Sequence, residues 1–277
     1  MSKVSVDREN IAAADAAVFH NPDVVAAYRY RPPYPEEVFD LLTNLITVVP
    51  HRVLDVGCGS GEIARYLVRR VEHVDAVDFS SAMIETGKQL PGGHDPRLRW
   101  LCGAIEDAPL DPPYALITAG ASLHWMAWPV VFPRLQAALA CGGYLVFIEQ
   151  RITPDVWSAL GDIIPRYRVD TYRAPARPMI EELQQRGFFQ AVGERVTEKV
   201  PFAQSIDAYI ASYHSRVGFA RERLGKERAA AFDQEARRSL IESYPNGSIT
   251  LQVAAQIVWG IPVRTQHQSF ALEHPSS

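Results

Sequence analysis

Apolar runs alternate with helical patterns through the first half of the chain. Short β-prone runs occur at Val53–Val56, Val71–Val77 and Leu98–Cys102, followed by Ala115–Ala119 and Tyr144–Glu149. Between them, apolar residues recur at helical spacing, as in residues 62–68 and Pro129–Ala140. Strands that alternate with helices in this way are typical of a parallel α/β sheet.

The pattern before and after this region is different. Glu36–Val49 reads as an amphipathic helix behind the rigid, aromatic segment 28–35. Residues 151–190 carry helical patterns rich in proline and arginine, and Val192–Val200 alternates like a sixth strand. Two amphipathic helices, at about Ser205–Arg223 and Lys226–Tyr244, precede a last apolar strand, Ile249–Trp259. We therefore expect one structural domain with a helical region inserted before its last strand.

The turn after the first strand carries the most specific signal. Asp55 precedes three alternate glycines, Gly57, Gly59 and Gly61, with Cys58 between the first two. Glycines at such a turn allow tight or positive-φ backbone and let a ligand approach the main chain. A dinucleotide site would need a glycine where Glu62 stands, and a phosphate-binding loop would need a lysine. An acidic residue before the glycines and the absence of a cationic one suit a ligand that has an ammonium group and no phosphate. The alternative is a glycine turn that binds no ligand.

This segment closely resembles motif I of the class I S-adenosylmethionine-dependent methyltransferases. The resemblance implies a Rossmann-like, seven-stranded, mostly parallel sheet whose last strand is antiparallel, with a helical cap. It divides the chain into residues 1–50 covering the cofactor pocket, a cofactor-binding core at 51–150, cap helices with the sixth strand at 151–247, and the last strand and tail at 248–277. Arg-Pro-x-Tyr-Pro at 31–35 and Ala-Ser-Leu-His-Trp at 121–125 are similar to the bacterial branch that includes trans-aconitate methyltransferase.

The resemblance also assigns residues to the cofactor, S-adenosyl-L-methionine, and its product, S-adenosyl-L-homocysteine. Asp78 ends the second strand and can accept both ribose hydroxyls. Phe79 would lie against the adenine, with Met83 either there or in the core. The expected cofactor contacts are Tyr28, Arg31, Asp55, Gly57, Cys58, Gly59, Asp78, Phe79, Met83, Ala104, Ile105, Glu106, Ala119, Gly120 and Ala121.

Some of these assignments leave alternatives open. Arg31 could hold the methionine carboxylate or the substrate, or be a solvated loop residue, and Asp107 competes with Glu106 for the adenine amine. His124 follows the fourth strand and is the candidate general base for a hydroxyl acceptor, but it could instead pack under the next helix.

Substrate contacts are the hardest to assign from the sequence. We expect Trp125 after the fourth strand and Tyr213 and His214 in the cap, although Tyr213 also fits the apolar stripe of its helix.

The Asp-Pro-Pro-Tyr at 111–114 looks like the signature of methyltransferases that modify exocyclic amines of DNA bases. In those enzymes the tetrapeptide follows the fourth strand, whereas here it precedes that strand and predicts a turn. A net charge of −4 also disfavours nucleic acid and anionic membranes as partners.

The cysteine content and the lack of recognisable targeting segments favour an enzyme that acts on a small molecule. Three widely spaced cysteines indicate neither a disulfide framework nor a metal site, and neither a signal peptide nor a bilayer-spanning run is recognisable. We expect a cytoplasmic monomer or homodimer that methylates a small molecule, with a binding protein of the same fold that transfers no methyl group, cyclase-like or regulatory, as the alternative. An RNA- or DNA-modifying enzyme is a further alternative.

Overall fold

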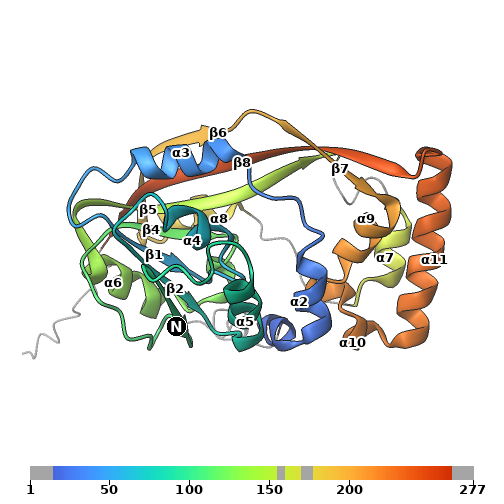
Figure 1. The fold of residues 1–277 in the computed structure, drawn as a ribbon, viewed down its shortest axis with the longest axis horizontal. Coiled ribbons are helices and arrows are strands. Elements are labelled where there is room, and N and C mark those ends of the chain that lie inside the picture. Colours follow the sequence, from blue (N-terminus) through green and yellow to red (C-terminus); the bar gives the residue numbers. More distant parts are fainter. Residues whose placement is uncertain (1–14, 155–159, 170–176, 264–277) are drawn as a thin grey trace, which may run out of the picture.

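The computed structural model describes residues 15–154, 160–169 and 177–263. One mixed sheet organises the chain, and its strands follow the order β3-β2-β1-β4-β5-β8-β6, with β7 paired to β8 beyond this path (Figure 1). The strands are β1 Arg52–Val56, β2 His73–Asp78, β3 Leu98–Cys102, β4 Tyr114–Gly120, β5 Leu139–Thr153, β6 Phe189–Val196, β7 Val200–Ser205 and β8 Ser248–Pro262.

The first five strands are parallel, and β8 runs antiparallel to both β5 and β6. The expected α/β architecture, mostly parallel with an antiparallel last strand, is therefore confirmed. The sequence pattern merged β6 and β7 into one sixth strand, Val192–Val200. In the structure, strand pairing with β8 ends at Val196 and begins again at Val200. Both segments therefore run along β8, and the sheet has an eighth strand.

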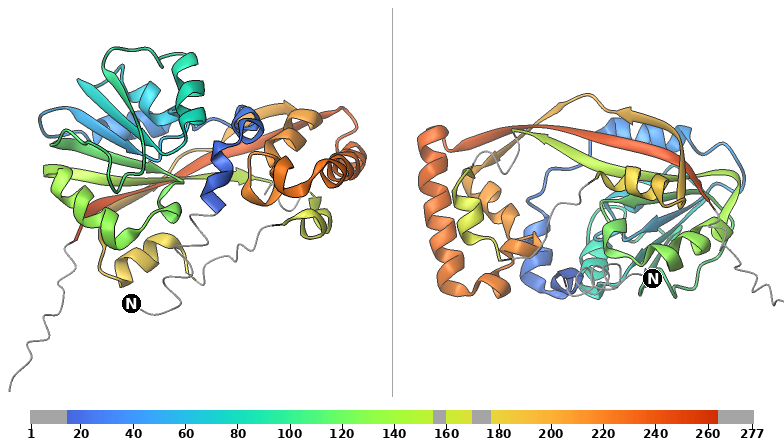
Figure 2. Two further views of the ribbon diagram at one scale, coloured as in Figure 1. Left: turned by 90° about the horizontal axis from the view of Figure 1, so that it is seen from below. Right: turned by 180° about the vertical axis from the view of Figure 1, so that it is seen from behind.

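Helices cover both faces of the sheet (Figures 1 and 2). Val38, Phe39 and Leu42 of α3 pack on one face together with α4, and Val131, Phe132 and Leu135 of α6 pack on the other. The helices of this part are α3 Glu36–Asn44, α4 Glu62–Leu67, α5 Ser81–Gln89, η2 Leu123–Trp125, α6 Trp128–Ala138 and α8 Met179–Gln185. These faces are apolar because burial of such side chains is the main favourable term in folding.

The cap has a hydrophobic core of its own. Tyr209, Tyr213, Phe219 and Phe232 are fully buried there against one another and against the start of β8. The expected single helix over Ser205–Arg223 is broken into shorter pieces. The cap consists of α7 Ile163–Tyr167, α9 Ile206–Tyr213, η4 Val217–Phe219, α10 Arg221–Leu224 and α11 Lys226–Ser243.

Two long strands join the core to the cap. β5 and β8 each contain 15 residues, about 50 Å of extended chain. They pair from Leu145 and Gly260 in the core to Thr153 and Gln252, beside which β7 pairs in the cap. Figure 1 shows both strands running from the core on the left toward the cap on the right, where β8 reaches α11. The cap is thus an extension of the same sheet.

The N-terminal segment, residues 15–35, lies between core and cap (Figure 2). It contains η1 Ala17–His20 and α2 Pro22–Tyr28. Phe19 and Val25 pack with Met83 of α5 and with Val217 of the cap. Asn21 begins α2 by accepting a hydrogen bond from the Asp23 amide at 2.8 Å. The parts of the expected 1–50 and 248–277 units at residues 1–14 and 264–277 lie outside the described residues.

The Asp-Pro-Pro-Tyr segment enters β4 at the end of the sheet away from the glycine loop, as its position in the sequence predicts. Tyr114 is buried and its hydroxyl donates to Asp75. Arg99 donates two hydrogen bonds of 2.7 Å to the same carboxylate. Burial alone would raise the pKa of Asp75, but these donors hold that pKa below its usual range. The segment therefore supports a buried polar network.

Among the described residues, no helix has both the length and the apolar character needed to cross a membrane.

Candidate functional site

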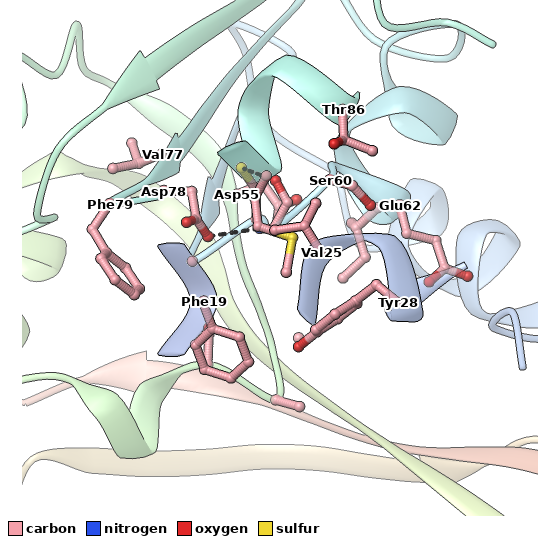
Figure 3. A pocket seen from close by; sticks show the side chains of 18 of the residues that line it. Phe19, Val25, Tyr28, Asp55, Ser60, Glu62, Val77, Asp78, Phe79 and Thr86 are labelled. Atoms are coloured by element: carbon pink, nitrogen blue, oxygen red, sulfur yellow. Dashed lines mark hydrogen bonds between the residues drawn. The ribbon is translucent and has the colours of Figure 1, made fainter. Parts of the chain in front are cut away.

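A cavity of about 1150 Å³ lies at the carboxyl ends of β1, β2 and β4. The N-terminal segment closes its opposite side, so that Phe19, Val25 and Tyr28 face Asp55 and Asp78 across it (Figure 3). In open parallel sheets, ligands bind outside the carboxyl ends of the strands at the point where the strand order reverses. Here that point lies between β1 and β4, next to the glycine loop.

The loop needs its glycines for two different reasons. Gly57, Gly59 and Gly61 all have positive φ, at 65°, 55° and 73°. A Cβ on Gly61 would lie 2.4 Å from the Trp100 ring, and one on Gly57 would lie 2.5 Å from Cβ of Ser122. A Cβ on Gly59 would have no protein atom within 4 Å. Gly57 and Gly61 therefore allow close packing, whereas Gly59 leaves main chain bare in the cavity.

Asp78 is held at the end of β2 by two main-chain amides. The Gly59 amide donates to one carboxylate oxygen at 2.7 Å, and the Ser80 amide donates to the other at 2.8 Å. Burial raises the pKa of Asp78 although these two donors oppose the change. Each oxygen keeps lone pairs that could accept from a ligand. The ring of the adjacent Phe79 contacts the His20 ring, with 4.9 Å between ring centroids, and Met83 is buried in the cavity wall.

Asp55 has one carboxylate oxygen without a hydrogen-bond partner in the described structure. The Thr118 hydroxyl donates to Oδ1 at 2.8 Å, while the buried Oδ2 receives no hydrogen bond. Burial raises the pKa of Asp55 to about 7, against the effects of Thr118 and of the nearby Ala64 amide. A buried polar atom of this kind is costly unless something donates to it. The ammonium group of S-adenosylmethionine is a donor that fits.

The third wall follows β3. Ala104, Ile105 and Glu106 line the cavity, as expected, and Asp107 is not among the lining residues. The Glu106 carboxylate accepts a hydrogen bond from the Ala127 amide at 3.1 Å, which ties this wall to the loop after β4. Its other oxygen could meet an amine such as that of adenine.

The end of β4 supplies small residues. Gly120 and Ala121 line the cavity, and a Cβ on Gly120 would lie 2.8 Å from Ile63. Ala121 has φ of 49°, a left-handed conformation that is strained for a residue with a Cβ. Ala119, expected beside them, lies in the hydrophobic core and not on the cavity. Its side chain alternates to the other face of the strand from Gly120.

His124 and Trp125 differ in position. Trp125 lines the cavity and contacts Phe19, with 5.6 Å between ring centroids. His124 is exposed, and its ring centroid lies 4.4 Å from that of Trp125. It is not among the residues that line the cavity. The surrounding protein and the positive charge of Arg31 lower the pKa of His124 to about 4. The imidazole is therefore neutral at pH 7.

The N-terminal segment adds Tyr28 and Arg31 to the lining. The Arg31 guanidinium lies 4.0 Å from the centroid of the Tyr28 ring. It also donates to the hydroxyl and the carbonyl of Ser215 in the cap, both at 2.8 Å. Arg31 thus spans the junction between the N-terminal segment and the cap while facing the cavity.

Glu62 and Tyr34 are among the lining residues that sequence reasoning missed. The Glu62 carboxylate accepts from the Tyr34 amide at 2.7 Å, and the Tyr34 ring contacts the end of β4 near Gly120. Burial raises the pKa values of both side chains. Acidic residues are common in the first turn of a helix, so the sequence did not mark Glu62 as a site residue. The Tyr-Pro pair at 34–35 was a usable signal for Tyr34.

Tyr213 and His214 do not contact the cavity, and their expected contact with substrate is corrected. Tyr213 is fully buried in the cap between Tyr209, Phe219 and Phe232. His214 is 2% exposed, with its ring nitrogens 2.7 Å from the Phe219 carbonyl and 2.7 Å from an Asp233 carboxylate oxygen. Tyr213 lies on the apolar stripe of its helix, which is the alternative that helical spacing offered, and that stripe faces the core of the cap.

The chain is similar to known methyltransferases. Residues 53–143 match a family model described as a methyltransferase domain. Malonyl-[acyl-carrier protein] O-methyltransferase of Anoxybacillus flavithermus is 37% identical over 32% of this chain and 34% of that protein. Trans-aconitate 2-methyltransferase of Pseudomonas aeruginosa is 32% identical over 48% and 47%. The matches thus span about a third to a half of these curated relatives.

The fold comparison covers more of the chain. A putative type II methyltransferase from Anaeromyxobacter dehalogenans superposes with a TM-score of 0.61 at 21% identity, over 83% of this chain and 97% of that one. A methyltransferase from Geobacter sulfurreducens in complex with S-adenosyl-L-homocysteine gives 0.51 at 15% identity, over 86% and 96%. The matched domain, the strand order and the glycine loop beneath Asp55 and Asp78 make residues 53–143 similar to a methyltransferase domain, which agrees with the resemblance of the loop to motif I of the class I S-adenosylmethionine-dependent methyltransferases.

Proposed function

We propose that this protein transfers the methyl group of S-adenosylmethionine to an oxygen of a small-molecule acceptor. The observation that carries the proposal is the polar pattern of the cavity. Asp55 offers an unpartnered oxygen, and Asp78 offers a carboxylate fixed by two amides, with the bare Gly59 main chain between them. The name of one relative, malonyl-[acyl-carrier protein] O-methyltransferase, supports oxygen as the methylated atom.

Each part of the cofactor has matching residues in this arrangement. Asp55 receives the ammonium group and Asp78 the ribose hydroxyls. Phe79, Ile105 and Glu106 bound the adenine, while Gly120 and Ala121 leave room for the methionine chain beside the end of β4. The cofactor supplies an activated methyl group on a sulfonium. The protein therefore works by holding the acceptor in line with it, and such alignment supplies about 7–11 kcal/mol of barrier lowering.

The position of His124 favours a carboxylate as the methylated group. A hydroxyl acceptor needs a base to remove its proton, and His124 stands outside the cavity lining. A carboxylate is already ionised at pH 7 and needs no base. A volume of about 1150 Å³ exceeds the usual range for a single ligand, which is consistent with cofactor and acceptor bound together.

Calorimetric titration with S-adenosylmethionine and S-adenosylhomocysteine tests the proposal. We expect micromolar binding of both that Asp78→Ala abolishes. Asp111→Ala is the matched control, because Asp111 pairs with Arg52 on the surface and does not line the cavity. Transfer of labelled methyl groups to small acids and phenols then identifies the acceptor class. Absence of both heat and thermal shift with either ligand would refute the proposal, whereas binding without transfer to any acceptor favours a binding protein of this fold.

A further inference from the structure

The Tyr34 hydroxyl reaches the cavity at the end of β4. Tyr34 lines the cavity, and a Cβ on Gly120 would lie 3.0 Å from the hydroxyl oxygen. Gly120 thus leaves the space that the hydroxyl occupies. Among the described residues none forms a hydrogen bond with this hydroxyl, since the polar contact that Tyr34 makes is through its amide. Its proton and its lone pairs are therefore available to a ligand.

Two contacts fix the backbone around Tyr34. The Gln150 side-chain amide of β5 donates to the Pro32 carbonyl at 2.7 Å, and the Tyr34 amide donates to Glu62 of α4 at 2.7 Å. A proline on each side of Tyr34 restricts the backbone further, because the ring of proline fixes φ. The hydroxyl is therefore held in position before a ligand binds, which lowers the cost of ordering it.

The hydroxyl lies farther along β4 than the expected ammonium site. Thr118 of β4 donates to Asp55, whose other oxygen has no partner in the described structure. Side chains alternate along a strand, so Gly120 is on the same face as Thr118, about 7 Å nearer the carboxyl end. In methionine, four bonds separate the ammonium nitrogen from the sulfur, a span of about 5 Å at ordinary bond lengths. A ligand with its ammonium group on Asp55 can thus bring its sulfonium to Tyr34.

The surroundings of the hydroxyl suit a positively charged group. Burial raises the pKa of Tyr34, and the negative charges of Glu62 and Asp55 raise it further. The phenol is therefore neutral, and its oxygen can accept from a cation. A sulfonium polarises the C–H bonds of its methyl group, and such bonds interact favourably with an oxygen. The thioether of S-adenosylhomocysteine has neither the charge nor the methyl group.

We infer that the Tyr34 hydroxyl contacts the sulfonium methyl group and lets the site distinguish S-adenosylmethionine from S-adenosylhomocysteine. The inference rests on the proposed function and adds to it a residue that recognises the charged form of the cofactor. Its consequence is weaker retention of the product, because S-adenosylhomocysteine lacks the group that Tyr34 contacts and is more readily replaced by new cofactor.

Calorimetric titration of the full-length protein with three ligands tests the inference. They are S-adenosylmethionine, S-adenosylhomocysteine and sinefungin, in which a carbon bearing an ammonium group replaces the sulfur and its methyl group. Tyr34→Phe should leave S-adenosylhomocysteine affinity within about twofold, since no contact to that ligand is lost. It should weaken S-adenosylmethionine binding about 2- to 5-fold, the effect of losing a C–H···O contact. Sinefungin should bind about 10- to 100-fold more weakly, because a charged hydrogen bond is lost.

Tyr66→Phe is the matched control. Tyr66 also lines the cavity, but it is 42% exposed and its ring is stacked on Phe39 of α3, with 4.1 Å between centroids. This change should leave the relative affinities for the three ligands unaltered. Both variants keep the aromatic ring, and thermal melting shows whether each is folded. Tyr34→Phe should melt at the wild-type temperature, because the hydroxyl that it removes has no partner in the described structure.

Three outcomes would overturn the inference. Equal loss for all three ligands in Tyr34→Phe would show that the hydroxyl meets a part common to them, such as the methionine carboxylate. Unchanged affinities would place the hydroxyl away from the methyl group. The same selective loss in Tyr66→Phe would show that the effect is not specific to Tyr34. Failure of the wild-type protein to bind S-adenosylmethionine and S-adenosylhomocysteine would instead refute the proposed function.

Discussion

The raised pKa of Asp55 predicts that cofactor affinity depends on pH. In the free protein the pKa of this buried carboxyl is about 7, against an ordinary 3.8, so the group is largely protonated at pH 6 and below. The ammonium group of the bound ligand favours the ionised form, and binding below pH 7 therefore releases a proton. Affinity should fall about tenfold per pH unit below 7, or about 100-fold and 3 kcal/mol at pH 5.

Calorimetry of S-adenosylhomocysteine binding between pH 5 and 8 measures this effect, and buffers of different ionisation enthalpy count the protons. 5′-Methylthioadenosine is the control ligand, because it keeps the ribose that faces Asp78 and lacks the ammonium. Its affinity should change much less with pH. Asp55→Asn should remove most of the pH dependence that separates the two ligands. A flat profile for S-adenosylhomocysteine, or an unchanged profile in Asp55→Asn, would refute the reasoning.

The same carboxylate should destabilise the free protein at alkaline pH. Because the pKa of Asp55 is raised in the folded state, its contribution to stability is complete below pH 3.8 and is lost as pH rises through 7. The full loss is up to about 4 kcal/mol. Asp55→Asn, which can still accept from Thr118, should therefore raise the melting temperature at pH 8 while weakening cofactor binding. A lower melting temperature would contradict this explanation.

Three further predictions concern single residues. Gly61→Ala should destabilise the protein by about 2 kcal/mol or more in denaturant titrations, because its Cβ would meet Trp100, whereas Gly59→Ala should cost less stability and more cofactor affinity. Tyr213→Ala should cost about 3–5 kcal/mol of unfolding free energy and leave S-adenosylhomocysteine affinity within about twofold. A larger loss of affinity would show that the ring contacts a ligand. His124→Ala should keep turnover within about threefold for a carboxylate acceptor, while a drop of about 10²–10⁴ would identify a general base and a hydroxyl acceptor.

Local patterns located the sheet and the residues that line the cavity at the ends of β1 and β2. Leu98–Cys102 has the same bounds in sequence and structure, since an apolar run between turn residues has few other solutions. Motif I predicted the loop because positive φ requires glycine. Tyr213 was expected at the substrate because it lies in the cap, whereas its helical spacing favoured the apolar stripe on which the structure places it. Ala119 was misplaced by one step in the alternation of β4.

Other features depend on pairing between distant segments. β5 extends to Thr153 because β8 lies beside it over its whole second half, which no local signal in residues 150–153 shows. The Arg31 contact with Ser215 joins residues 184 positions apart, so sequence alone offered Arg31 as cofactor contact, substrate contact or surface residue. Tertiary packing decided these cases.

The continuous pairing of β5 with β8 determines how ligands can enter. A cap that swung away from the core would have to break the hydrogen bonds of both strands along the junction, including those between Arg151–Thr153 and Gln252–Ala254. Local opening in proteins occurs where few such bonds must break. The N-terminal segment has no strand pairing and is attached by side-chain contacts, such as those of Phe19 with Ser80 and of Arg31 with Ser215. We therefore expect ligands to exchange by release of this segment, with cap and core moving as one piece.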